Sequence, residues 1–96
     1  MTTLLFFSSP QCGVCHALQP KLQEAVQEHY PNTQFKVINV AEDPISAGQN
    51  SVFTLPAVLI FYNQREQFRF ARSFSVQQVL DALSKINPEP SSPPPQ

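Results

Sequence analysis

Two hydrophobic patterns alternate in the first forty residues, and their order restricts the fold more than any other feature of the chain. Residues 4–7 (LLFF) form a continuous apolar run before a Ser-Ser-Pro turn, which is typical of a strand buried on both faces. From Gly13 the apolar and thiol positions recur every three or four residues, as on one helix face, until Tyr-Pro-Asn at 30–32 interrupts them. Residues 35–40 are again strand-like. This order predicts a βαβ unit with parallel strands and a right-handed crossover.

The middle of the chain predicts a short helix and a pair of strands. Residues 45–50 fit a short helix, and residues 57–62 (AVLIFY) form a third apolar strand. After a polar connector at residues 63–66, apolar and polar side chains alternate over residues 68–71, as in a half-buried antiparallel edge strand.

The last helix has both a start signal and an apolar face. Ser75, with Gln78 three residues later, resembles a capping box. The helix that follows carries its apolar side chains on one face: Val76, Val79, Leu80, Leu83 and Ile86. The whole order predicts an α/β domain. It has a four-stranded mixed sheet, a βαβ unit followed by a β-hairpin and a C-terminal helix, and helices on both faces.

The length of the chain allows only one domain. A chain of 96 residues, of which 42% are hydrophobic, is too short for two independent cores. We therefore predict a single domain over residues 1–87. Five of the ten prolines fall in residues 88–96, a composition that favours polyproline II or disorder. We expect this Pro-rich tail to have no enzymatic role, and the protein to be a monomer.

Charge and hydropathy argue against several kinds of partner. The formal net charge is -1, and the six Lys and Arg residues are scattered, so no basic patch for nucleic acid is present in the sequence. The N-terminus lacks the basic region and long apolar stretch of a secretory signal, and no apolar run approaches the length of a membrane span. These features predict a soluble, cytoplasmic protein that binds neither nucleic acid nor membranes.

Cys12 and Cys15 form a Cys-x-x-Cys motif at the predicted start of the first helix. A disulfide between them would close too small a loop to stabilise the fold, so the pair is placed for reactivity. A Cys12 thiolate would face the unsatisfied N–H groups of the first turn, which can lower a thiol pKa from about 8.5 toward roughly 7. Cys12 is therefore the predicted nucleophile, and Cys15, one turn further on the apolar face, is the predicted resolving thiol.

His16 lies four residues after Cys12, where a protonated imidazole could stabilise the thiolate. An ordinary surface histidine is the alternative.

A zinc site needs about four ligands, and only His16 and His29 are available beside the cysteines, so no metal is predicted. The run Cys-Gly-Val-Cys-His also matches the c-type haem attachment pattern. A βαβ setting with Met1 as the only methionine argues against haem.

Beyond these features, much of the chain resembles the thioredoxin family. The CGVC run matches the family's active-site motif, and Pro20 stands at the position of its helix-kinking proline. Residues 39–56 (NVAEDPISAGQNSVFTLP) align without a gap with the thioredoxin segment that leads to its cis-proline, so Pro56 matches that proline. The resemblance covers about residues 4–86. The family's usual first strand and helix have no counterpart before Leu4.

The resemblance implies a thioredoxin-like fold and thiol–disulfide exchange with protein substrates, with reduction as the expected direction. In this family the loop around the cis-proline packs against the disulfide and pairs its backbone with an extended substrate. Thr54, Leu55 and Pro56 are therefore the expected substrate-binding edge. The resemblance further implies disulfide-bearing proteins as substrates, a thioredoxin-reductase-type electron donor and no cofactor.

Four positions depart from the family's pattern. Phe6 replaces the buried aspartate that assists proton transfer at the resolving cysteine, and Val37 replaces its lysine partner. Without that pair, Cys15 would lose its proton to water or to a neighbouring group, which would slow turnover. Gln11 replaces the usual tryptophan before the motif, and Val14 replaces the proline within it.

Two other functions stay open at this point. A glutathione-dependent glutaredoxin is one, because Thr54-Leu55-Pro56 resembles its Thr-Val-Pro loop, although residues 70–74 (FARSF) lack its Gly- and Asp-rich stretch. A non-catalytic module that binds a partner through a hydrophobic rim is the other, although the retention of both cysteines argues against it.

Five phenylalanines fall on or beside predicted strands: Phe53, Phe61, Phe68, Phe70 and Phe74. We expect them to pack in the core and against the sheet rather than to bind a ligand. Phe53, together with Val52, would also border the active site.

Overall fold

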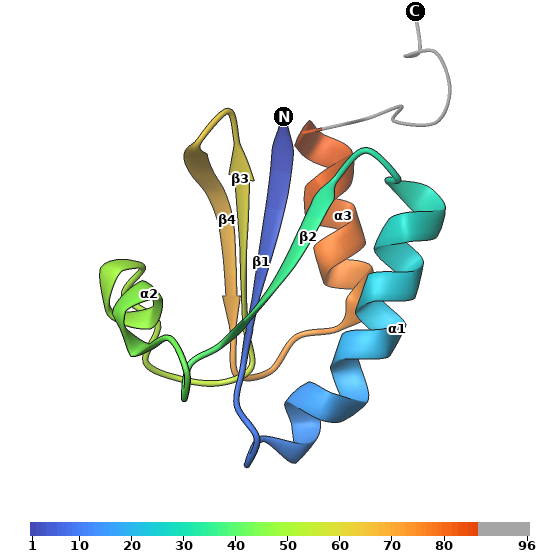
Figure 1. Ribbon diagram of the computed structural model, residues 1–96. Helices are drawn as coiled ribbons and strands as arrows, with labels where there is room; N and C mark the ends of the chain where they lie inside the picture. The colour runs from blue at the N-terminus through green and yellow to red at the C-terminus, as the bar shows by residue number, and fades with distance from the viewer. Residues whose placement is uncertain (87–96) are drawn as a thin grey trace, which may run out of the picture.

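The computed structural model describes residues 1–86, which fold in the order βαβαββα (Figure 1). The strands are β1 (Thr2–Ser8), β2 (Gln34–Asn39), β3 (Ala57–Tyr62) and β4 (Arg65–Ala71). The helices are α1 (Gly13–His29), α2 (Pro44–Gln49) and α3 (Val76–Ile86). Every predicted helix and strand is present, whereas the predicted Pro-rich tail lies outside the described residues. None of the helices in residues 1–86 is long and apolar enough to span a bilayer.

The four strands form one mixed sheet in the order β2-β1-β3-β4. β1 runs parallel to β2, with α1 as the crossover between them, and antiparallel to β3, whose other edge pairs with β4. Leu4, Phe6 and Phe7 on β1 are fully buried, as expected for a central strand. The predicted fold, a βαβ unit followed by a hairpin and a helix, is confirmed.

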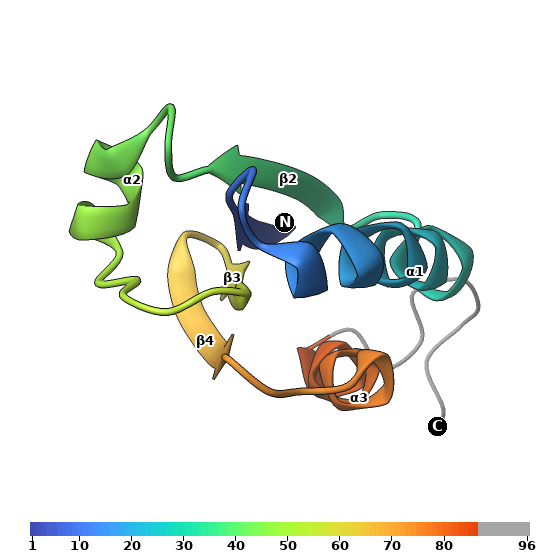
Figure 2. The same cartoon turned by 90° about the horizontal axis from the view of Figure 1, so that it is seen from below.

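The helices lie on both sides of the sheet, with α1 and α3 on one side and α2 on the other (Figure 2). α1 and α3 lie side by side on one face, where Leu22 and Leu83 pack with Phe6 in the main core cluster. Phe7, the next residue on β1, packs with Leu59 in a second cluster, which the segment after α2 joins. Adjacent residues of a strand point to opposite faces, so these two clusters mark the two sides of the sheet. The predicted helices on both faces are confirmed.

Polar side chains cap the first turns of α2 and α3. The Ser75 hydroxyl accepts from the Gln78 N–H at 3.1 Å, and the Gln78 side-chain oxygen accepts from the Ser75 N–H at 2.8 Å. These reciprocal bonds confirm the predicted capping box. Before α2, Asp43 accepts from the Ser46 hydroxyl at 2.7 Å and from the Ser46 N–H at 3.1 Å. Both bonds hold the pKa of Asp43 below its ordinary value, the hydroxyl bond contributing most.

The hairpin is tighter than its sequence predicts. β4 already begins at Arg65, so the connector consists of Asn63 and Gln64 alone, with φ of 52° and 71°. A two-residue turn of type I′ requires the left-handed conformation at both central residues, which Asn adopts more readily than most.

Phe53 is 85% exposed, so its predicted place in the core is wrong. Val52 and Leu55 take the inward positions of this segment and pack against the second cluster instead. The other four phenylalanines are half-buried and pack against the core, as predicted: Phe61, Phe68, Phe70 and Phe74.

Candidate active site

The cysteine pair lies at the start of α1, at the lower end of the sheet in Figure 1. The Cys12 N–H donates to the Ser9 carbonyl at 3.1 Å, which closes the turn between β1 and α1. Cys12 is the N-cap residue of the helix, and its Sγ accepts from the Cys15 N–H at 3.2 Å. The two cysteines form a disulfide, with their Cα atoms 5.2 Å apart. The helix start thus brings both sulfurs and a backbone donor together.

The two sulfurs differ in exposure. Cys12 is half-buried at the surface, whereas Cys15 is fully buried in the main core cluster with Leu22 and Val58. The Cys15 Sγ lies 3.9 Å from the carbonyl oxygen of Phe7. A molecule that approaches from solvent therefore meets Cys12, while Cys15 is shielded.

The residues between the cysteines leave room for an approaching chain. Val14 is 63% exposed, and a Cβ placed on Gly13 would meet no atom within 4 Å. Gly13 therefore leaves open space beside the disulfide, and Val14 offers apolar surface to a partner.

The segment before β3 lies at the same end of the sheet as the cysteines, because Ala57 at the start of β3 pairs with Phe7. The Leu55–Pro56 peptide bond is cis. Pro56 is buried, and its carbonyl accepts from the N–H of Arg72 at 2.8 Å. The sequence could not reveal this part played by Arg72, because a backbone N–H leaves no signature in residue type.

Thr54 and Leu55 come directly before Pro56 in this segment. Both are half-buried, and the Leu55 side chain packs against both core clusters. Within the described part of the chain, the N–H and C=O of Leu55 have no hydrogen-bond partner. These backbone groups are available to an extended peptide that aligns with the segment.

His16 lies one turn after Cys12, and its N–H donates to the Cys12 carbonyl at 3.2 Å. The imidazole itself is exposed. Phe6, at the place of the family's buried acid, is fully buried in the cluster that contains Cys15. Among residues 1–86 the buried polar side chains are those of Thr2 and Ser8, so no carboxylate is buried behind Cys15.

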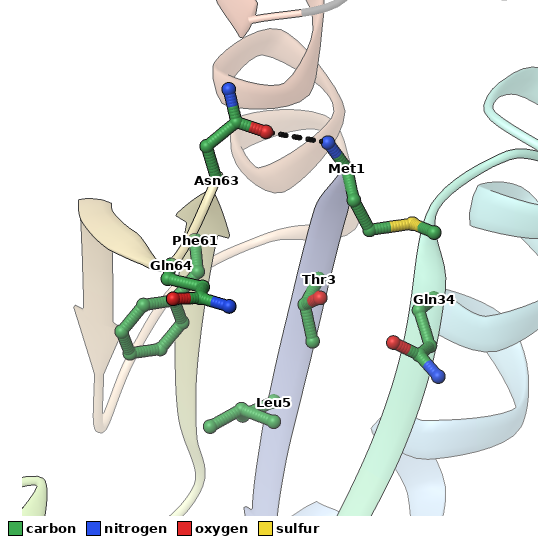
Figure 3. A pocket seen from close by; sticks show the side chains of 7 residues that line it. All are labelled: Met1, Thr3, Leu5, Gln34, Phe61, Asn63 and Gln64. Atoms are coloured by element: carbon green, nitrogen blue, oxygen red, sulfur yellow. Dashed lines mark hydrogen bonds between the residues drawn. The ribbon is translucent and has the colours of Figure 1, made fainter.

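A cavity of about 590 Å³ lies at the opposite end of the sheet (Figure 3). It is lined by Met1, Thr3, Leu5, Gln34, Phe61, Asn63 and Gln64. The N-terminal amine donates to the Asn63 side-chain oxygen at 2.7 Å at its rim. The lining side chains include no carboxylate, thiol or imidazole. In the described part of the chain, no three His, Cys, Asp or Glu side chains gather as a metal site would need.

Comparison with known proteins identifies the family of this chain. The family model described as Thioredoxin matches residues 1–85. The chain belongs to the thioredoxin family. A thioredoxin-family chain whose two cysteines lie at disulfide distance is a thiol–disulfide oxidoreductase, and the fold here is the thioredoxin fold.

Individual relatives agree with this assignment. The chain is 34% identical over 84 residues to "Thioredoxin-like protein YdfQ" of Bacillus subtilis (strain 168), covering 88% of this chain and 74% of that protein. Thioredoxin 1 from Thermosipho africanus TCF52B matches with a TM-score of 0.82 and 32% identity, covering 90% of this chain and 94% of that one. A third relative is "NADPH-dependent thioredoxin reductase 3" of Arabidopsis thaliana, 33% identical over 61 residues. That match covers 64% of this chain and 12% of that protein.

Proposed function

We propose that this chain reduces disulfide bonds in protein substrates, with Cys12 and Cys15 of the CGVC motif as its catalytic residues. The observation that carries the proposal is the unequal exposure of the two sulfurs, one half-buried at the surface and one fully buried. A reductase needs one thiolate that the substrate can reach and a second thiol that acts only after the first is engaged. The bond from the Cys15 N–H to the Cys12 Sγ supports Cys12 as the thiolate.

The reduced pair then acts in two exchange steps. The Cys12 thiolate attacks one sulfur of the substrate disulfide, which forms a mixed disulfide and releases the other substrate sulfur as a thiolate. Cys15 loses its proton and attacks the Cys12 Sγ, which releases the second substrate sulfur and leaves the Cys12–Cys15 disulfide. Two electrons have passed to the substrate, and its two sulfurs take up protons from water.

Thr54, Leu55 and Pro56 are the proposed substrate-binding edge. An extended peptide can pair with the free N–H and C=O of Leu55 in the manner of an added strand. This edge and Cys12 lie at the same end of the sheet, so a peptide held on the edge presents its disulfide to the Cys12 sulfur.

Proton transfer is the step in which this chain departs from the family's pattern. Phe6 leaves no buried acid behind Cys15, so we propose that water accepts the Cys15 proton. His16, one turn along α1, is proposed to stabilise the Cys12 thiolate when its imidazole is protonated.

The oxidised pair needs an electron donor before the next cycle. We propose a thioredoxin-reductase-type protein for this role, in line with the similarity to part of a protein named NADPH-dependent thioredoxin reductase 3.

We further propose that the protein is a cytoplasmic monomer. In this proposal residues 1–87 form its domain, and residues 88–96 form a tail without enzymatic role.

The proposal is tested by a redox titration together with an insulin reduction assay. The reduction potential of the pair is measured against glutathione, and insulin reduction is compared between the wild type and Cys12→Ser. A potential below the cytosolic glutathione poise of about −220 to −260 mV, with activity lost in the variant, would support the proposal. Activity that requires glutathione would instead favour the glutaredoxin-like alternative. A pair that forms no reversible disulfide, or activity indifferent to Cys12, would leave only a binding module.

A further inference from the structure

The connection from α2 to β3 begins with a left-handed turn. Asn50 is the C-cap of α2, and Ser51 after it has φ of 55°. The N–H groups of the two residues bond back into α2, to the carbonyls of Ser46 and Gly48. The carbonyls of Asn50, the C-cap, and of Ser51 beyond it have no partner within α2, so a side chain or water must supply one.

Arg69 on β4 supplies both partners. Its Nη1 donates to the Ser51 carbonyl at 3.0 Å, and its Nη2 donates to the Asn50 carbonyl at 2.8 Å. Its Nε and Nη2 also donate to the two carboxylate oxygens of Glu66, at 2.8 Å and 2.9 Å. One planar guanidinium therefore connects a carboxylate of its own strand with two carbonyls 18 and 19 residues earlier in the chain.

Glu66 fixes the direction in which the guanidinium points. The two parallel bonds hold its plane, as in other bidentate Arg–carboxylate pairs, and leave the remaining N–H groups facing the two carbonyls. The side chains of Arg69 and Glu66 are 38% and 35% exposed, and an exposed ion pair by itself adds little stability. The pair therefore serves to orient the Arg69 guanidinium rather than to add stability.

The hydrogen bonds of Arg69 hold residues 44–52, whose other side-chain hydrogen bonds are local. In the described part of the chain they are the only side-chain hydrogen bonds that connect residues 44–52 to the sheet. The other side-chain bonds of this segment stay within residues 43–50. Only three residues separate Ser51 from Leu55, so the position of Ser51 limits where the proposed substrate-binding edge can lie.

We propose that Arg69 is a positioning residue for substrate binding. By connecting Glu66 to the carbonyls of Asn50 and Ser51, it holds the segment that ends in Thr54 and Leu55 in the conformation that pairs with a peptide. This inference rests on the proposed function, because it assumes that the edge receives the substrate.

The test compares Arg69→Ala with Arg65→Ala, which removes the same charge from the opposite end of β4. For Arg69→Ala we expect the KM for insulin to rise about tenfold, with kcat changed less than about twofold, because charge-assisted bonds of this kind are worth about one factor of ten. Reduction of hydroxyethyl disulfide, which is too small to pair with the edge, should not change. Amide hydrogen exchange at Val52, whose N–H donates to the Ala47 carbonyl at 2.8 Å, should accelerate in Arg69→Ala alone. Arg69→Lys should restore little, because an ammonium cannot hold four acceptors in one plane.

The Glu66→Gln variant gives a second measurement that leaves Arg69 in place. Its KM should rise by a smaller factor, about threefold, because Gln keeps one acceptor oxygen but loses the charge. An equal KM for Arg69→Ala and Arg65→Ala, with the wild type active, would overturn this inference and leave the proposed function standing. Equal losses with insulin and hydroxyethyl disulfide would also overturn it, since they would place the effect at the cysteines. A wild type that reduces neither disulfide would overturn both.

Discussion

Phe6 and Val37 lie opposite each other in the parallel ladder between β1 and β2, and Phe6 packs in the core cluster that contains Cys15. Val37 is 43% exposed, and neither side chain can accept a proton. The proposed second step requires Cys15 to lose a proton inside this apolar cluster. Because residues 1–86 include no buried carboxylate, we expect this proposed step to depend on water and on pH.

We expect the release of substrate from the mixed disulfide to accelerate with pH up to and beyond about 8.5, where ordinary thiols ionise, because apolar surroundings disfavour the Cys15 thiolate. The rate should not level off near neutral pH, because no buried acid or base takes part. Stopped-flow measurement of product release at a series of pH values checks this, with formation of the mixed disulfide followed separately in Cys15→Ser. A release rate that is constant above about pH 7 would mean that another group accepts the proton.

The two cysteines should give opposite results when each is replaced by serine. Cys15→Ser should accumulate a mixed disulfide between Cys12 and the substrate, because nothing remains to release it. Cys12→Ser should form no such adduct, because the Cys15 sulfur is shielded. Mass spectrometry after incubation with insulin distinguishes the two. Cys15→Ser should also be less stable than Cys12→Ser, by about 1–3 kcal/mol, since it buries a hydroxyl in an apolar cluster.

An adduct of equal yield in both variants would contradict the assigned order of the cysteines. Thermal unfolding of each variant in its fully reduced form is the control for the difference in stability. The wild type must be reduced as well, so that the disulfide does not contribute to the comparison.

The sheet and helices could be predicted because burial imposes a period on the sequence. Leu4 to Phe7 are apolar without interruption since β1 is covered on both faces, and the face of α3 follows the helical repeat. The position of the cysteine pair at a helix start was predictable for the same reason. These features depend on side chains close together in the sequence.

The tight hairpin and the bonds of Arg69 could not be predicted in this way. Asn63 and Gln64 do not form one of the Gly-containing pairs that usually indicate a two-residue turn. Arg69 bonds to carbonyl oxygens, which every residue carries, and they come close only after α2 and β4 have folded. The sequence pattern is misleading for Phe53, because a phenylalanine beside a strand is usually buried.

Phe53 should contribute to substrate binding and not to stability. Its side chain is 85% exposed and, with Val52 and Leu55, borders a hollow of about 390 Å³ beside the proposed substrate-binding edge. Phe53→Ser should change the free energy of unfolding by no more than about 0.5 kcal/mol, as for other exposed positions. The KM for insulin should rise several-fold because apolar contact area is lost, while reduction of hydroxyethyl disulfide stays the same. Ile45→Ser, at a position that is 69% exposed on α2, is the matched control.

Acid should weaken the attachment of the α2–β3 connection through Glu66. The hydrogen bond from Arg69 lowers the pKa of Glu66 below its ordinary value of 4.5, against a smaller opposing effect of burial. A carboxyl whose pKa is lower in the folded state contributes stability above the unfolded pKa and loses it as the pH falls through the folded pKa. The Ser51 and Thr54 amide signals should therefore shift in NMR spectra as the pH falls below 4.5.

In Glu66→Gln this acid transition should be absent, because the titrating group has been removed. Asp43 also has a lowered pKa, and its bonds to Ser46 cap α2 at the other end, so it could move the same amides. Asp43→Asn is therefore the control, and the shift of Ser51 should survive in it. If the shift disappears in Asp43→Asn and persists in Glu66→Gln, the acid response comes from the α2 cap. The carboxylate of Glu66 would then not hold the guanidinium in place.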